Sequence, residues 1–330
     1  MRHPLYDIMK YIRLHTTNPY YNLAVEEYLF RHADTDIFML WQNEPSVIAG
    51  KNQNVYAEVD LAYSEAHGIH ICRRITGGGA VYHDLGNINY TFISAGGEAK
   101  PLDFEFFSRP IRHALSRLGL ETTMSDRNDI ECGGLKFSGN AQHAEGGRIL
   151  HHGTILFDTD FSVMESVLKV DKEKLAYRAV KSLRARVVNL KTLLGENISL
   201  DGFLSAIEED VCKDLGAEPM SLPENEEIRR LYERNRSHEW IFSDKRYLTS
   251  YAVQRKKKYP FGLVMVDMAL ERDIIQSIKI SGDFFSRQPV ERLESALIGK
   301  DRRDLSSIDP SPYIHGMTPS DLMELLSDPQ

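Results

Sequence analysis

The sequence is short of cysteine and has no long hydrophobic run. Its 330 residues include only three cysteines, Cys72, Cys132 and Cys212, which lie far apart and form no CxxC pair. An odd number of dispersed cysteines does not suit a disulfide framework, so we expect reduced thiols in a cytoplasmic protein. No segment reaches the length of a membrane span, and the N-terminal stretch MRHPLYDIMKYIRLH lacks the apolar core of a secretory signal.

The chain also lacks the features of common anion-binding proteins. Its formal net charge of −8 argues against nucleic-acid binding, which requires a basic face. No window fits the P-loop pattern GxxxxGK[ST], and the Rossmann pattern fails because Tyr82 stands where a third glycine is needed. Any anion must therefore be held by a local site of another kind.

What is present fits a globular protein with a substantial core, because 42% of the residues are hydrophobic and 27% are charged. The length favours one large domain and a smaller one. Apolar periodicity and turn residues predict strands at 36–41, 46–49, 69–73, 88–93, 135–138, 149–157, 261–269 and 274–280. They predict helices at 18–32, 59–67, 103–118, 290–297 and 319–326, and a mostly helical segment from 161 to 240.

Strands and helices intermingle without a regular repeat, which favours an α+β fold with a mostly antiparallel sheet over a doubly wound one. Strict alternation predicts that the strand at 88–93 is half buried. Within the first helix, the spacing places Tyr21, Ala24, Val25 and Tyr28 on one face. The lysine-rich segment 254–258 is expected to be a loop near the start of a small α/β domain.

The segment 73–87 reads RRITGGGAVYHDLGN and follows an expected strand. Three successive glycines are entropically costly, so another group must approach their backbone closely. Their N–H groups could face an anion, with Arg73 or Arg74 supplying a planar cationic fork for a phosphate or carboxylate. The alternative is a flexible turn between two strands with solvated arginines.

Two later segments complete a pattern with this loop. Residues 126–141 contain RND and KFSGNA, and residues 151–156 read HHGTIL. In this order and spacing, the segments resemble the lipoate-protein ligase family, whose hallmarks are RRxSGGGAVxHDxGN, GRND, KxSGxA and HHGTLL. The resemblance extends from an NxAxEE pattern at 22–27 to GDFF at 282–285, and so covers nearly the whole chain.

The resemblance implies an α+β core shared with biotin-protein ligases and class II aminoacyl-tRNA synthetases. The catalytic domain would span residues 1–245, and a small accessory domain would span 246–330. It implies that lipoate or octanoate attacks ATP to give acyl-AMP and pyrophosphate. The acyl group then passes to a lysine of a lipoyl domain of 2-oxoacid dehydrogenase E2 subunits, or of glycine-cleavage H protein. We expect a monomer.

Carried over by position, Lys136 is the catalytic residue and contacts both the lipoate carboxylate and the α-phosphate. The residues implied at ATP are Arg74, Gly79, Ala80, Val81, Tyr82 and Lys136. Those implied at lipoate are Lys136, Arg74, Gly78 and His152. Supporting positions are Thr76, Asn87, Asp129, Ser138, Gly139, Ala141, Gly153 and Thr154. The family reaction thus requires Arg74 and Lys136 to converge on one acyl-adenylate.

Several of these residues have a plainer interpretation. Lys136 alone could be a surface lysine in a turn, and Asp84 and Asn87 could hold the loop through bonds from side chain to backbone. His151 and His152 should point to opposite faces of a strand, which argues against a metal site.

Magnesium should enter with ATP, and Asp129 is the one candidate carboxylate for it. An apolar slot for the acyl chain could be lined by Val47, Ile75, Tyr90 and Phe137, although each could equally be core.

Rival functions remain open at this point. A lipoyltransferase would use preformed lipoyl-AMP, and an octanoyltransferase would form a thioester on Cys132. A non-catalytic binding protein would not need Arg74 and Lys136, and a biotin ligase would need a GRGRxG loop that is missing. Thr76 replaces a common serine and Phe137 a common isoleucine, and the pattern after residue 240 is loose, which leaves the interdomain junction undefined.

Overall fold

The computed structural model describes residues 9–96, 100–125, 128–169, 186–195, 197–242 and 251–327. The chain forms two compact units. The larger unit comprises Met1–Ile48, Val59–Cys72 and Val81–Ser237, and the smaller comprises Ala49–Glu58, Arg73–Ala80 and His238–Gln330. The expected boundary between residues 245 and 246 lies outside the described residues and stays a prediction, as does any role of Arg127 in the RND motif.

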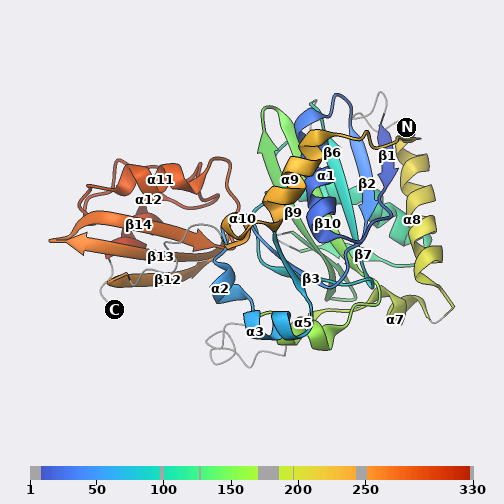
Figure 1. Ribbon diagram of the computed structural model, residues 1–330, viewed down its shortest axis with the longest axis horizontal. Helices are drawn as coiled ribbons and strands as arrows, with labels where there is room; N and C mark the ends of the chain where they lie inside the picture. Colours follow the sequence, from blue (N-terminus) through green and yellow to red (C-terminus); the bar gives the residue numbers. More distant parts are fainter. Residues whose placement is uncertain are drawn as a thin grey trace. The chain divides into compact units, whose positions relative to one another are not determined.

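The larger unit is built on an eight-stranded sheet (Figure 1). Its spatial order is β11 (Glu218–Pro219), β1 (Lys10–Arg13), β2 (Ile37–Trp41), β6 (Asn87–Ser94), β10 (Arg148–Leu156), β9 (Leu135–Glu145), β8 (Asp129–Cys132) and β7 (Thr122–Met124). β1 runs parallel to β2 and β11, and the other neighbours are antiparallel. The expected mixed, mostly antiparallel sheet is confirmed.

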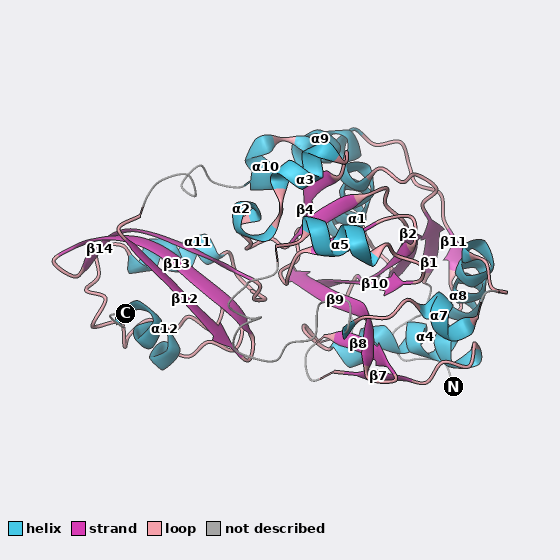
Figure 2. Cartoon of the chain, turned by 90° about the horizontal axis from the view of Figure 1, so that it is seen from below, coloured by secondary structure: helices cyan, strands magenta, loops and turns pink. Residues whose placement is uncertain are grey.

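Helices cover both faces of this sheet (Figure 2). The described helices of the larger unit are α1 (Pro19–His32), α3 (Leu61–Ala66), α4 (Phe104–Arg117), α5 (Phe161–Val167), α7 (Leu190–Leu194), α8 (Leu200–Leu215) and α9 (Glu226–Arg236). The main hydrophobic core joins α4 and α8 to one sheet face, through residues such as Phe107, Phe203 and Phe92. α1 lies against β6 and β10 on the other face and also packs against α9.

Covered faces explain two differences from the sequence-based expectations. All eight residues of β6 are buried, so the prediction of a half-buried strand is wrong. α1 begins as predicted, because Asn18 Oδ1 accepts a hydrogen bond from the N–H of Tyr21 at 3.1 Å and Pro19 follows. The predicted single apolar face differs from the structure in two ways. The helix lies between the sheet and α9, so residues on both of its sides are buried. Two members of the predicted face, Tyr21 and Tyr28, are only half buried.

A second, three-stranded sheet in the order β4 (His70–Arg73), β3 (Ser46–Ala49) and β5 (Val81–His83) flanks the glycine-rich segment. Residues 74–80 connect β4 to β5, which pairs with β3 in antiparallel fashion. The loop is thus held by a strand at each end, as the sequence indicated for its first end only. The short strands β1, β5, β7, β8 and β11 were not predicted, whereas β3 and β4, which are also only four residues long, were.

The smaller unit contains α2 (Val55–Glu58), α10 (His238–Phe242) and a C-terminal layer of strands and helices. This layer consists of the antiparallel strands β12 (Val253–Tyr259), β13 (Gly262–Glu271) and β14 (Ile274–Gly282), with α11 (Val290–Leu297) and α12 (Pro319–Ser327). It has its own hydrophobic core, which includes Val266, Ile278, Leu293 and Leu325. The expected accessory α/β domain is confirmed.

The expected lysine-rich loop at 254–258 is wrong, because these residues form the edge strand β12. Exposure alternates along the strand, and the half-buried Lys257 forms an ion pair with Glu324 of α12. Long basic side chains can cover apolar surface with their stems, and charges on an edge strand discourage pairing with other chains. Among the described residues, no helix combines the length and apolar character that crossing a membrane requires.

Candidate functional site

The larger unit gathers one group of the predicted site residues on strands β8, β9 and β10. Lys136 Nζ lies 2.8 Å from Asp129 Oδ1, and both side chains are partly exposed. Gly139 lies beside this pair, because a Cβ atom added there would be 3.1 Å from Lys136 Nζ. The glycine therefore leaves room for the lysine side chain to cross the strand and reach Asp129.

A register shift in β9 determines which way Lys136 points. Asp129 pairs with Gly139 and Ile130 with Ser138, but Glu131 pairs with Lys136, so β9 has one extra residue. Because side chains alternate along a strand, such a bulge changes the face to which the following residues belong. Phe137 consequently enters the hydrophobic core, while Lys136 shares the opposite face with Gly139.

Other predicted residues divide between the two sheet faces. Thr154 Oγ1 accepts a hydrogen bond from the N–H of Gly139 at 3.2 Å, and Ala141 lies opposite His152. Ser138 is fully buried and lies within 3.4 Å of the Asn140 amide, on the face away from Gly139. A phosphate contact for Ser138 stays a prediction.

Gly153 is the glycine that the core requires. A Cβ atom there would lie 2.3 Å from Asn140 Oδ1 and 2.4 Å from the Tyr90 hydroxyl, which donates a hydrogen bond to that same oxygen. Tyr90 and Phe137 belong to the hydrophobic core and Val47 is also fully buried, which fits the core interpretation of these three slot candidates. Ile75, in the smaller unit, is partly exposed.

His152 belongs to a buried polar network that the sequence did not predict. Its Nδ1 lies 2.9 Å from Glu26 Oε1, which also accepts a hydrogen bond of 2.6 Å from the Thr91 hydroxyl. Thr91 accepts in turn from Trp41 Nε1 at 3.0 Å. A carboxylate only accepts, so Nδ1 of His152 carries the proton. The network fixes the ring on the sheet face that also carries Thr154.

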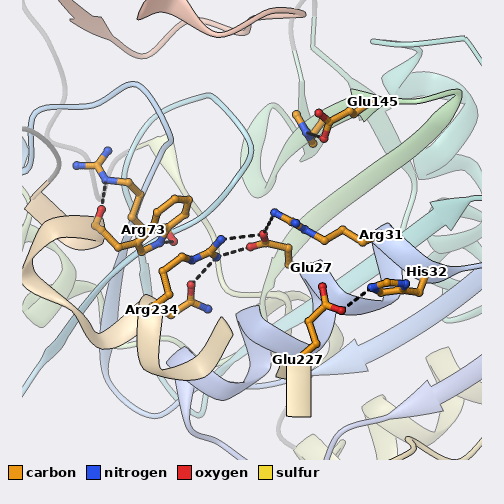
Figure 3. Close-up of polar contacts among 10 residues, drawn as sticks. Glu27, Arg31, His32, Arg73, Glu145, Glu227 and Arg234 are labelled. Carbon is orange, nitrogen blue, oxygen red and sulfur yellow. Dashed lines mark hydrogen bonds and ion pairs between the residues drawn. The ribbon is translucent and has the colours of Figure 1, made fainter. Parts of the chain in front are cut away.

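The second glutamate of the NxAxEE pattern has a different partner. Glu27 accepts hydrogen bonds from Arg31 within α1 and from Arg234 of α9, as Figure 3 shows. One helix thus uses adjacent carboxylates for two purposes, since Glu26 faces the sheet and Glu27 faces α9. The pattern had suggested family membership but no role for either residue.

His151 faces the main core, as expected for the neighbour of His152 on a strand. It is fully buried and its ring stacks on Phe107 at a centroid distance of 5.2 Å. Gln142 accepts from the N–H of Leu102 through Oε1, so its amide nitrogen donates to His151 Nδ1 at 2.9 Å. Burial, followed by the neighbouring His152, lowers the pKa of His151 well below its usual value.

The residues after the glycine loop mainly support structure. Asp84 accepts from the N–H groups of Gly86 at 2.9 Å and Asp160 at 2.8 Å, and burial raises its pKa. Asn87 donates to Asn89 on the same strand at 2.9 Å. For Asp84 this is the loop-holding role that the sequence had left open.

Val81 and Tyr82 lie on β5, paired with Ile48 and Val47 of β3. Tyr82 is only 4% exposed, and burial, followed by the charges of Asp84 and Asp160, raises its pKa. Both positions thus begin the strand that carries the chain out of the glycine loop.

The smaller unit contains the glycine loop itself, with Arg74 folded onto it. Arg74 Nε donates to Thr76 Oγ1 at 2.9 Å, and Nη2 donates to the carbonyls of Gly77 and Gly79, each at 2.7 Å. The side chain is 5% exposed. Arg74 thus shapes the loop from inside, and the hydroxyl of Thr76 performs a task that a serine could also perform.

The three glycines differ in what lies beside them. A Cβ atom at Gly77 would be 2.5 Å from the Phe284 carbonyl oxygen, and Gly78 has a φ of +88°. The N–H of Gly78 donates to the same carbonyl at 3.5 Å. Gly79 has open space around its Cα and, with the partly exposed Ala80, is accessible. At Gly77, therefore, the group that closely approaches the loop backbone is the GDFF segment of the same chain.

Arg74 belongs to the smaller unit and Lys136 to the larger one, so their convergence stays a prediction. Sequence reasoning missed Thr91 and Trp41, which carry no local motif, and gave Glu26 no role. It also missed Gly50, whose absent Cβ would lie 2.1 Å from the Gly78 carbonyl oxygen.

Comparison with known proteins identifies the family. Residues 18–211 match the lipoyl protein ligase A/B catalytic domain, and residues 249–326 match the C-terminus of bacterial lipoate protein ligase. The chain belongs to the lipoate-protein ligase family. It is 35% identical to lipoate-protein ligase LplJ of Bacillus subtilis over 323 residues. The matched region covers 94% of this chain and 97% of the relative.

The fold of this chain resembles solved structures of lipoate-protein ligases. A bipartite lipoate protein ligase of Thermoplasma acidophilum, studied with its E2 lipoyl domain, is 28% identical with a TM-score of 0.62, covering 72% of this chain and 96% of that one. A lipoate-protein ligase A bound with ATP is 26% identical with a TM-score of 0.60, covering 72% and 98%. The chain is thus a ligase-family enzyme over most of its length.

Proposed function

We propose that this ligase-family enzyme joins lipoate to protein in two steps. In the first, a carboxylate oxygen of lipoate or octanoate bonds to the α-phosphorus of ATP, and the bond to pyrophosphate breaks. In the second, a lysine amine of the acceptor attacks the acyl carbonyl, loses a proton, and AMP leaves. The observation that carries the proposal is the Lys136 ammonium, held by Asp129 above Gly139 at the position of the family motif.

Lys136 is the proposed catalytic residue because both steps concentrate negative charge. An ammonium group is a compact charge that can follow an oxygen while the phosphorus becomes five-coordinate. The Asp129 ion pair, with partly exposed side chains, keeps the ammonium beside Gly139 without burying it. Substrate carboxylate and phosphate oxygens would then replace or join Asp129 as its partners.

The proposed nucleotide contacts are Arg74 and the run Gly79, Ala80, Val81 and Tyr82. Support comes from the open backbone at Gly79 and from the arginine that braces the loop. The related ligase A bound with ATP supports the nucleotide itself. For lipoate we propose Lys136, Arg74, Gly78 and His152, the last held by Glu26.

Magnesium is proposed to arrive with ATP. The described part of the chain contains no group of three or more His, Cys, Asp or Glu side chains able to hold a metal ion. Asp129, the candidate carboxylate, lies against Lys136, which competes with a cation for its oxygens. This donor set suits Mg²⁺ bound mainly by substrate phosphates, whose charge it would partly neutralise.

The proposed acceptors are the lipoyl domains of 2-oxoacid dehydrogenase E2 subunits and the glycine-cleavage H protein. The archaeal relative studied with its E2 lipoyl domain supports the first class. We place the reaction in the cytoplasm and propose a monomeric enzyme. The three cysteines, which are free thiols in the structure, are consistent with that compartment.

The thioester alternative loses support at Cys132. Burial raises the pKa of this thiol, as does the nearby charge of Glu121, so the nucleophilic thiolate is disfavoured. The side chain packs at the margin of the main core. A lipoyltransferase that only uses preformed lipoyl-AMP differs from a ligase in one observable, the release of pyrophosphate from ATP and free lipoate.

The test is mass spectrometry of a purified lipoyl domain incubated with the enzyme, Mg²⁺, lipoate and ATP. We expect a mass gain of one lipoyl group that requires ATP and is retained in Cys132→Ser. A mass gain from lipoyl-AMP but never from ATP plus lipoate would identify a transferase. Loss of the product in Cys132→Ser would support the thioester route instead.

A further inference from the structure

Arg73, the first arginine of the loop motif, has a role that neither the motif nor the proposed chemistry assigns. Its side chain is 3% exposed and turns away from the loop that follows it. Nη1 donates to the carbonyls of Gly50 at 2.8 Å, Lys51 at 3.0 Å and Gln53 at 2.8 Å. The guanidinium is therefore committed to backbone oxygens.

The same guanidinium also holds α10. Nε donates to the carbonyls of Trp240 at 3.0 Å and Ile241 at 2.9 Å, and the indole Nε1 of Trp240 donates back to the carbonyl of Arg73 at 2.9 Å. Figure 3 labels Arg73 and marks one hydrogen bond from its guanidinium with a dashed line. One buried side chain thus joins two segments that are almost 190 residues apart in sequence, as the residue numbers 53 and 240 show.

The segment that Arg73 holds is the wall against which the glycine loop lies. The N–H of Lys51 donates to the Thr76 carbonyl at 2.8 Å, and the N–H of Arg74 donates to the Ala49 carbonyl at 3.0 Å. Gly50 packs so closely on the Gly78 carbonyl that a Cβ atom would be 2.1 Å from it. A shift of residues 50–53 would therefore displace the loop backbone.

The geometry requires arginine rather than any cation. Carbonyl oxygens approach the guanidinium from two directions, and a planar group with five N–H donors can serve both at once. A lysine has one nitrogen on a flexible stem and cannot span the two segments. Arg74, in contrast, directs its donors into the loop itself.

We propose that Arg73 is a positioning residue, which presents the glycine loop to the nucleotide. It does so by tying residues 50–53, on which the loop packs, to α10. This inference rests on the proposed function for the identity of the ligand, ATP. It assigns to Arg73 no contact with substrate and no share in the chemistry.

The test compares Arg73→Lys, Arg73→Met and Trp240→Phe with wild type by calorimetric titration of ATP with Mg²⁺, and separately of lipoate. We expect both Arg73 variants to weaken ATP binding by about tenfold or more, as for several lost charge-assisted hydrogen bonds. Lipoate binding should weaken by a smaller factor, because two of its four proposed contacts, Lys136 and His152, lie outside the loop. Trp240→Phe should weaken ATP binding by a smaller factor. Arg117→Lys, on the exposed surface of α4, is the matched control and should bind as wild type does.

A spectroscopic signal separates clamping from a general loss of structure. The chain has two tryptophans, so 5-fluorotryptophan gives two ¹⁹F resonances, with Trp240 assigned by Trp240→Phe. Arg73→Lys should shift the Trp240 resonance and leave that of Trp41 in place. If Arg73→Lys does not fold, the ATP affinity of Trp240→Phe decides the question.

Three results would overturn the proposed positioning role of Arg73. They are wild-type ATP affinity in Arg73→Lys, wild-type ATP affinity in Trp240→Phe, or equal weakening of ATP and lipoate binding. Wild-type affinity in Arg73→Lys with loss in Arg73→Met would show that only the charge matters. If wild type binds ATP but makes no lipoyl-AMP, the proposed function fails, while the titrations still decide whether Arg73 positions the loop. If it binds no ATP, both proposals fall.

Discussion

At the scale of single residues, two adjacent histidines illustrate how environment separates identical side chains. His152 is held by the carboxylate of Glu26, whereas His151 is surrounded by aromatic rings and accepts from Gln142. The alternation of a strand predicts their opposite faces from the sequence. It cannot predict the partners, because Glu26 and Gln142 come from elements that only the fold brings near.

The buried His151 makes stability depend on pH. Its pKa is lowered in the folded state, so below about pH 6.5, the unfolded value, the unfolded chain binds a proton that the folded chain cannot. Its contribution is fully present above that pH and is lost as the pH falls, with a limiting slope of about 1.4 kcal/mol per pH unit.

We therefore expect urea denaturation of wild type to show falling stability from about pH 6.5 to 5, and a flatter dependence in His151→Gln. The variant should be less stable at neutral pH, because it fills the core less well. Parallel pH curves for the two proteins would contradict the assignment.

At the scale of elements, β9 combines a core residue and a catalytic candidate in adjacent positions. The bulge opposite β8 sends Phe137 into the core and leaves Lys136 with Gly139. The sequence predicts a strand there from its apolar residues, but no local signal marks the extra residue. The same limit applies to β12, where successive basic residues indicate a loop although one of them, Lys257, forms an ion pair with Glu324 of α12.

Gly139 gives a test of this local arrangement. In Gly139→Ala, the new Cβ would meet the flexible end of Lys136, with Nζ at 3.1 Å, and would lie 3.7 Å from Asp129 Oδ1. The lysine should move while the strand stays intact. We expect the rate of lipoyl-AMP formation to fall at least tenfold, with the free energy of unfolding changed by less than about 0.5 kcal/mol.

Gly153→Ala is the contrasting variant on the neighbouring strand. Its Cβ would collide with Asn140 and Tyr90, so it should cost roughly 1–3 kcal/mol in stability. Urea denaturation and single-turnover formation of lipoyl-AMP measure the two effects. Wild-type rates in Gly139→Ala would show that its glycine does not serve Lys136.

At the scale of the whole molecule, the described residues form two separate hydrophobic cores, one in each unit. The sequence indicated a larger domain followed by a smaller one from length and the order of elements. It did not indicate that residues 49–58 and 73–80 would join the smaller unit, because such contacts are made between segments far apart in the chain.

The core of the smaller unit contains a buried ion pair that should control its stability. Lys279 Nζ lies 3.4 Å from Glu294 Oε1, and both side chains are less than 5% exposed. Removing one partner leaves the other charge buried, which costs about 3–5 kcal/mol.

We expect Lys279→Met to lower the unfolding midpoint of the smaller unit in urea, while the transition of the larger unit stays near its wild-type position. Backbone amide exchange, resolved by peptide, assigns each transition to its unit. Equal loss of protection in both units would contradict independent cores.

The most direct test of the account is lipoate-dependent pyrophosphate release from ATP by Lys136→Ala. Removal of a charge that acts in the transition state should slow this step by about 100- to 1000-fold, equivalent to about 3–4 kcal/mol. Circular dichroism should match wild type, because Lys136 is partly exposed. Pyrophosphate release at the wild-type rate by the folded variant would remove Lys136 from the chemistry and with it the proposed site.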